Sequence, residues 1–160
     1  MIGLKNIAKK VAEVVLITLV IVISLPFLIL VVIYTFVRDL YIKTRIELKW
    51  PNEKFILFTY SESENWSQYI EENIIPEISN HAVVINRTKQ QNWKEEYPLE
   101  LKAIEVLAGL EVNPIALIFR NGLRVRKVTL FEAFRDLKHG KDLKIKGQCE
   151  EIFRYVPNHP

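Results

Sequence analysis

A single uninterrupted apolar run constrains this chain more than any other feature. From Val14 to Val37 the sequence holds 24 residues without a charged residue or a glycine. At about 1.5 Å per residue, a helix of that length reaches roughly 36 Å, more than the about 30 Å hydrocarbon core of a bilayer. A cleaved signal peptide has an apolar core of about 7–15 residues that ends at small residues, whereas this run ends at Tyr34, Phe36 and Arg38. We therefore predict an N-terminal tail at 1–13 and an uncleaved transmembrane helix at 14–37.

The side of the membrane on which the rest of the chain lies stays open. The positive-inside rule counts Lys and Arg close to each end of a span. The basic residues before the run are Lys5, Lys9 and Lys10, and those after it are Arg38, Lys43, Arg45 and Lys49. Because these sets are nearly equal, the sequence predicts a single-pass membrane protein without an assigned orientation.

Charge and cysteine content exclude several classes of function. The 160-residue chain carries 22 Lys+Arg and 19 Asp+Glu, and a near balance without a concentrated basic excess argues against a nucleic-acid partner. The lone cysteine, Cys149, excludes an intramolecular disulfide, a CxxC pair and a multi-cysteine zinc site. His81, His139 and His159 have no second histidine or carboxylate at metal-ligand spacing. We therefore expect no metal and no cofactor.

After an expected juxtamembrane linker at 38–44, strand-like and helix-like patterns alternate. Strands are expected at 55–60, 82–85, 115–119 and 123–128, with helices at 66–77, 98–110, 129–138 and 149–156. Asn121-Gly122, between the last two strand-like runs, is a strong hairpin signal. This order predicts an α/β domain over 45–156, whose mixed sheet is covered by helices on both faces, and a C-terminal tail at 157–160.

Two stretches of the domain, together with the order of its elements, carry a family resemblance. The first is Gly109-Leu110-Glu111-Val112-Asn113-Pro114-Ile115-Ala116-Leu117-Ile118-Phe119-Arg120-Asn121-Gly122. The second is Lys146-Gly147-Gln148 followed by Glu150, Glu151, Ile152 and Phe153. The domain resembles the thioredoxin-like family, in which the first stretch corresponds to a glycine, a cis-proline, a buried strand and a tight hairpin, and the second to the start of the last helix. An extra segment at about 129–142 is lacking in compact members of that family.

The resemblance implies a peptide-binding site without redox chemistry. Where the family has its CxxC motif, this chain has Ser63-Glu64-Asn65-Trp66-Ser67, and a serine hydroxyl cannot replace a thiolate nucleophile. The family's cis-proline and the residue before it pair with an extended peptide, so the resemblance implies that Asn113 and Pro114 do the same beside Ser63, Glu64, Asn65 and Trp66. The alternative is a proline that only shapes its loop, and the low frequency of cis X–Pro bonds, about 5–6%, favours that alternative.

Two further features have competing interpretations. Cys149 repeats at helical spacing with Ile152, Phe153 and Val156, which favours a small core residue over a reactive thiol. The segment that follows the apolar run at 115–119 is basic through Arg120, Arg124, Arg126 and Lys127. An anionic lipid surface or an acidic partner is one hypothesis for these side chains, and a solvated face is the alternative.

The sequence as a whole favours a membrane-anchored, redox-inactive module that binds or scaffolds a protein or peptide. An enzyme that uses Cys149 or the loop 61–67 near Pro114 is one alternative. An accessory subunit of a membrane complex is another.

Overall fold

In a computed structural model of the chain, residues 2–90, 92–120 and 122–157 are described, with the side chains of 2–8 and 12 left out. Asn121 and His159, both used in the sequence predictions, lie outside the described residues, as does most of the expected tail at 157–160. The chain divides into two compact units, Met1–Arg38 and Asp39–Pro160.

Helix α1 (Ile2–Lys49) contains the apolar run. Among the described residues it is the one helix long and apolar enough to cross a membrane. Pro26 lies inside it without ending it. The linker expected at 38–44 is helical instead, because no glycine or proline occurs between Phe27 and Trp50 to interrupt the hydrogen-bonding pattern.

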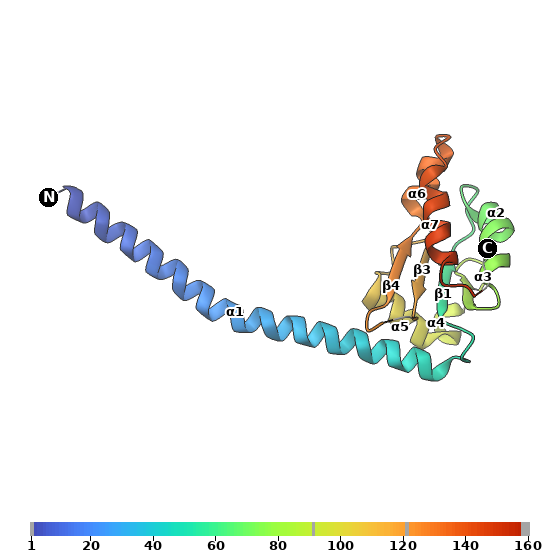
Figure 1. Cartoon of the computed structure of the whole chain (residues 1–160), viewed down its shortest axis with the longest axis horizontal. Helices are drawn as coiled ribbons and strands as arrows, with labels where there is room; N and C mark the ends of the chain where they lie inside the picture. The colour runs from blue at the N-terminus through green and yellow to red at the C-terminus, as the bar shows by residue number, and fades with distance from the viewer. Residues whose placement is uncertain (1, 91, 121, 158–160) are drawn as a thin grey trace. The chain divides into compact units, whose positions relative to one another are not determined.

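The second unit contains a four-stranded mixed sheet in the order β2-β1-β3-β4 (Figure 1). Strand β1 (Ile56–Tyr60) pairs in parallel with β2 (Ala82–Asn86) and antiparallel with β3 (Ile115–Ile118). Strand β4 (Arg126–Thr129) pairs antiparallel with β3. The expectation of an α/β chain with a mixed sheet and a long apolar N-terminal helix is therefore confirmed.

Helices lie between β1 and β2, between β2 and β3, and after β4. Between β1 and β2 are α2 (Ser67–Tyr69), the π-helical turn η1 (Ile70–Ile74) and α3 (Ile75–Ile78), and between β2 and β3 are α4 (Trp93–Glu96) and α5 (Pro98–Leu107). After β4 come α6 (Phe131–Lys138) and α7 (Leu143–Phe153). The helix expected at 66–77 is thus divided. The wide π turn comes directly before Pro76, which has no N–H to donate and whose ring crowds the preceding turn of a regular helix.

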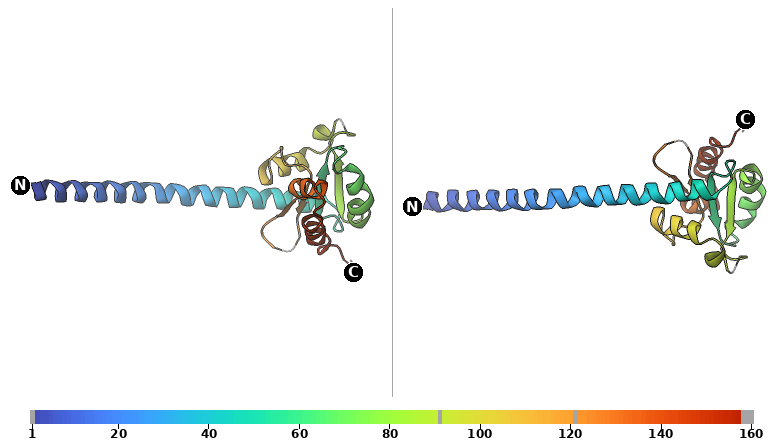
Figure 2. Two further views of the ribbon diagram at one scale, coloured as in Figure 1. Left: turned by 90° about the horizontal axis from the view of Figure 1, so that it is seen from above. Right: turned by 90° about the horizontal axis from the view of Figure 1, so that it is seen from below.

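Alternating side chains of the sheet enter two separate cores. Phe58 of β1 and Ala116 of β3 face a core completed by α3, α6 and α7, whereas Leu57 and Leu117 face a core completed by α4, α5 and the end of α1. Figure 2 shows α3 and α5 on opposite sides of the strands. The period-two alternation of a strand explains why every β1 residue is buried.

The last turns of α1 belong to the second core. Ile42 and Ile46 are buried at helical spacing, and Trp50 packs edge-on against Phe119 with ring centroids 5.5 Å apart. The carboxylate of Glu100, in α5, is 1% exposed and accepts hydrogen bonds from Trp50 Nε1 at 2.7 Å and from Lys49 Nζ at 2.8 Å. This buried carboxylate fixes the end of α1 to α5.

The hairpin between β3 and β4 is longer than the tight turn predicted at Asn121-Gly122. Its last residue pair joins Ile118 to Arg126, so residues 119–125 form the connection. Phe119 donates its N–H to the carbonyl oxygen of Phe55 at 2.8 Å and is buried. This hydrogen bond continues the antiparallel pairing of β3 with β1 by one residue beyond Ile118. β4 begins at Arg126, later than the predicted residue 123.

Candidate functional site

The carboxyl ends of β1 and β2 meet the start of β3 at one edge of the sheet. The segment Ser61–Ser67 follows β1, residues 87–89 follow β2, and Asn113-Pro114 precedes β3. Ligands of open α/β sheets bind outside the carboxyl ends of the strands. The sheet therefore brings the two halves of the predicted binding site, the loop 61–67 and the residues Asn113 and Pro114, to the same edge.

The loop 61–67 is held by its own hydrogen bonds. The carbonyl oxygen of Ser63 accepts from the backbone N–H groups of Trp66 at 3.1 Å and Ser67 at 2.9 Å, and from Ser67 Oγ at 2.7 Å. The indole Nε1 of Trp66 donates to the carbonyl oxygen of Ser61 at 2.8 Å. Glu64 and Asn65 are exposed at the outside of this turn. The loop consequently presents polar side chains on a fixed backbone.

Asn113 and Pro114 are joined by a cis peptide bond. The side-chain Nδ2 of Asn113 donates to Ser61 Oγ at 2.7 Å, which connects this residue to the loop. The backbone N–H and C=O of Asn113 make no hydrogen bond to another described residue, although the carbonyl oxygen of its neighbour Val112 accepts from the Arg87 guanidinium at 3.3 Å. A half-buried residue thus carries a backbone donor and a backbone acceptor that an extended segment could use.

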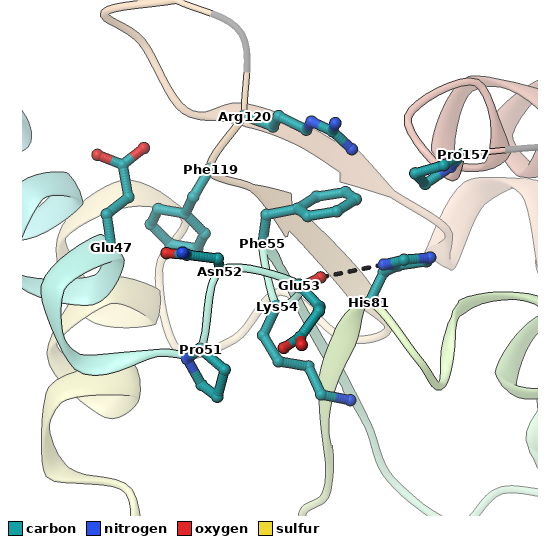
Figure 3. Close-up of a pocket in the computed structure, with 10 residues that line it drawn as sticks. All are labelled: Glu47, Pro51, Asn52, Glu53, Lys54, Phe55, His81, Phe119, Arg120 and Pro157. Carbon is teal, nitrogen blue, oxygen red and sulfur yellow. Dashed lines mark hydrogen bonds between the residues drawn. The ribbon is translucent and has the colours of Figure 1, made fainter.

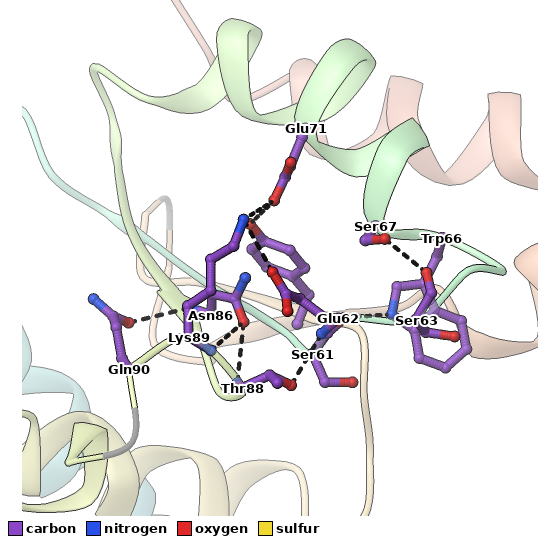
Figure 4. A network of polar contacts seen from close by, with 11 residues as sticks. Ser61, Glu62, Ser63, Trp66, Ser67, Glu71, Asn86, Thr88, Lys89 and Gln90 are labelled. Carbon is purple, nitrogen blue, oxygen red and sulfur yellow. Dashed lines mark hydrogen bonds and ion pairs between the residues drawn. The ribbon is translucent and has the colours of Figure 1, made fainter.

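An ion cluster beside the loop was not predicted from the sequence. Figure 4 shows the ammonium group of Lys89 between two carboxylates, 3.0 Å from Glu62 and 3.2 Å from Glu71. The hydroxyl of Tyr60 donates to Glu71 at 3.0 Å. The hydrogen bonds from Lys89 and then from Tyr60 lower the pKa of Glu71, and burial followed by the Glu71 contact raises the pKa of Tyr60.

The sequence contained one signal for this cluster. Glu62 and Lys89 lie just beyond the carboxyl ends of two strands that pair in parallel, with Tyr60 opposite Asn86. If β1 and β2 are assumed to pair in parallel, the residues that directly follow the carboxyl ends of these two strands are expected to lie close together. The helical pattern around Glu71 gives no sign of this contact, because its partner Lys89 lies in another segment.

Cys149 lies inside the first core rather than at this edge. Its side chain is 6% exposed and forms no disulfide. Cys149 and Tyr69 line the same small surface pocket. Burial raises the pKa of its thiol to about 11. A thiol with that pKa is almost entirely protonated at neutral pH, which is unfavourable for a nucleophile.

The four basic residues proposed as a surface do not form one uniform patch. Arg126 forms an ion pair with Glu151, and Arg120 lies 4.6 Å from the centre of the Phe55 ring while donating to the carbonyl oxygen of Tyr155. Arg124 and Lys127 are exposed. Two of the four basic side chains, Arg120 and Arg126, therefore already contact other groups of the same domain.

A cavity of about 550 Å³ lies at the opposite edge of the sheet, where β1 begins. Figure 3 shows Arg120 above the Phe55 ring and His81 pointing to the backbone oxygen of Glu53. Its cationic groups already have partners, because Lys54 donates to the carbonyl oxygens of Ser79 and Ala82 and Arg120 donates to Tyr155. This cavity is therefore a weaker candidate for a binding site than the sheet edge at Asn113.

No group of three or more His, Cys, Asp or Glu residues within the described ranges is arranged to hold a metal ion. Comparisons of the chain with protein-family models, with curated proteins and with solved structures find no match. The chemistry of the sheet edge is therefore the basis for a functional assignment.

Proposed function

We propose that this chain is a single-pass membrane protein whose thioredoxin-like domain, without redox activity, binds an extended segment of a partner protein at the edge formed by Ser61–Ser67 and Asn113-Pro114. The observation that carries the proposal is the pair of backbone groups on Asn113, which make no hydrogen bond to another described residue beside a preformed loop. An extended segment that pairs with these two groups gains main-chain hydrogen bonds, and the loop beside them is already held by its own hydrogen bonds.

The thioredoxin-like assignment has support in the order of elements. A strand, a helical segment, a parallel strand, a second helical segment, an antiparallel hairpin and two closing helices follow one another, with a cis-proline before the buried third strand. The absence of cysteine from residues 61–67 argues against thiol–disulfide exchange. These observations favour binding without redox chemistry at this edge.

The membrane anchor rests on α1. Its apolar residues from Val14 to Val37 are exposed, and an exposed apolar surface of this length is stable in a bilayer but not in water. Extraction of membranes with alkaline carbonate should leave the chain in the pellet. Release into the supernatant would contradict the anchor, and reporters fused after residue 160 would determine the side on which the domain lies.

Site-specific photocrosslinking tests the binding site. A benzoylphenylalanine replaces Asn65, which is exposed in the loop, or Lys102, which is exposed on α5. The proposal predicts a discrete crosslinked protein from position 65 that is not formed from position 102. Its yield should fall in Asn113→Ala, because this change removes the Nδ2–Ser61 hydrogen bond that holds the backbone groups of residue 113 beside the loop. The same products from both positions, or products that persist unchanged in Asn113→Ala, would contradict it.

A further inference from the structure

The extra helix α6 forms a small cleft with the two residues that precede α2. The cleft has a volume of about 160 Å³ and is lined by Asn65, Trp66, Phe131, Phe134, Arg135 and Lys138. The ring of Trp66 contacts Phe131 and Phe134 with centroid distances of 6.1 and 6.2 Å. Three aromatic rings from two separate segments thus make an apolar floor.

This cleft lies beside the edge at Asn113. The carbonyl oxygen of Pro114 accepts from the N–H of Leu130 at 3.0 Å, which sets the start of α6 directly beside the cis-proline. Trp66 joins the two regions from the other side, because its indole bonds to Ser61, and Ser61 bonds to Asn113. A segment paired with Asn113 is therefore next to the aromatic floor.

The rim of the cleft is cationic. Arg135 forms an ion pair with Glu132, its neighbour on α6, whereas Lys138 is exposed and makes no ion pair with a described residue. Phe131 is 47% exposed, although it is a large apolar side chain. An apolar floor with an uncompensated positive charge at its rim is complementary to a bulky apolar side chain that has an acidic neighbour.

We propose that this cleft is the specificity pocket of the binding edge and that it takes one bulky apolar side chain of an acidic protein segment. An apolar cavity of about 150 Å³ holds a group the size of benzene, so the cleft is matched to a leucine or phenylalanine side chain and is too small for a lipid acyl chain. The inference rests on the proposed function, since it names the kind of segment that the edge binds.

The test uses the full chain in neutral detergent micelles, labelled with 5-fluorotryptophan. Trp66 belongs to the first core and lines the cleft, whereas Trp50 and Trp93 are buried in the second core. The ¹⁹F resonance of Trp66 therefore reports on the cleft, and the other two resonances are internal controls. The probes are the acetylated and amidated peptides EELEE, EEAEE and KKLKK.

The proposal predicts a saturable shift of the Trp66 resonance with EELEE. Binding of EEAEE should be roughly tenfold weaker, because the cleft then loses part of the burial of three carbon atoms. KKLKK should not bind measurably. Lys138→Glu should weaken binding of EELEE about fivefold and reduce its salt dependence, whereas Lys141→Glu, an equal charge change at an exposed residue outside the cleft, should change it less than twofold.

The exposed aromatic ring has its own matched control. Phe131→Ser should weaken binding of EELEE about tenfold, and Leu123→Ser, at a residue 67% exposed in the β3–β4 connection, should have no effect. Equal affinity for EELEE and EEAEE would overturn the proposal. A Trp66 shift caused by phosphatidylserine in a nanodisc, and not by peptide, would also overturn it and would assign the cleft to the membrane surface.

Failure of this inference is distinguishable from failure of the proposed function. If the edge binds a partner without using the cleft, the crosslink from position 65 persists in Phe131→Ser and Lys138→Glu. If the cleft binds apolar acidic peptides but Asn113 does not pair with them, the Trp66 shift occurs with unchanged affinity in Asn113→Ala.

Discussion

Removal of the Glu100 carboxylate should destabilise the second unit at the point where α1 meets α5. Glu100 is 1% exposed and is the acceptor for the buried Trp50 indole at 2.7 Å. In Glu100→Ala the indole N–H is left without an acceptor, which costs about 1–3 kcal/mol. The side chain of Lys49 is 43% exposed, so it regains water and its lost ion pair adds at most about 1 kcal/mol. We expect a total loss of about 2–3 kcal/mol.

Glu100→Gln separates the two contributions. Glutamine keeps an oxygen acceptor for Trp50 and loses the charge opposite Lys49, so this variant should lose about 1 kcal/mol. Glu105→Ala is the matched control on the same helix, since Glu105 makes a 3.5 Å ion pair with Lys102 near the surface. It should change the free energy of unfolding by less than about 0.5 kcal/mol.

The assay is urea unfolding of the full chain in neutral micelles, followed by tryptophan fluorescence. Thermal unfolding should show a midpoint lowered by about 6–12 °C in Glu100→Ala, given the size of the unit. The reasoning is refuted if Glu100→Ala is as stable as Glu105→Ala. It is also refuted if Glu100→Gln and Glu100→Ala lose the same free energy, because the Trp50 acceptor would then contribute nothing.

Three further predictions concern the core, the ion cluster and the thiol. Phe134 is 1% exposed and Phe131 is 47% exposed, so by urea unfolding Phe134→Ala should cost about 3–5 kcal/mol and Phe131→Ala less than about 1 kcal/mol. Lys89 lowers the pKa of Glu71, so this contact stabilises the fold above the ordinary carboxyl pKa and is lost as pH falls through the lowered pKa. Lys89→Met should therefore reduce stability at pH 7 and show a smaller further loss at pH 3; an identical pH profile would contradict the contact. Because burial raises the pKa of Cys149 to about 11, its alkylation by iodoacetamide at pH 8, followed by mass spectrometry, should be about two orders of magnitude slower in the folded chain than in urea, and equal rates would disprove it.

The strands and most helices were predictable because their signals are local. Buried runs such as 55–60 and 115–119 combine β-favouring residues with turn residues at their ends, and Pro98 starts α5 as the rule for first-turn prolines predicts. The continuation of α1 through residues 38–44, expected as a juxtamembrane linker, was not predicted. Ile42 and Ile46 are buried because they pack in the second core, whose other residues are distant in sequence.

The candidate site was predictable in part. The resemblance to a family pointed to the loop 61–67 and Asn113-Pro114, and antiparallel pairing of β1 with β3 brings these two segments to one edge. The contact of Trp66 with Phe131 depends on how α6 packs, and no local pattern encodes that packing. The Lys89 cluster likewise joins three segments that are distant in sequence.

Hydrogen exchange at Asn113 tests the central claim most directly. The full chain is measured alone and with the purified partner obtained by crosslinking from position 65, and amide exchange is resolved at single residues. The account predicts that the Asn113 N–H exchanges rapidly in the free chain and is slowed on binding, whereas the amide of Ile104, inside α5 and buried, stays protected in both states. An Asn113 amide that is already protected in the free chain, or that is unaffected by the bound partner, would contradict the account.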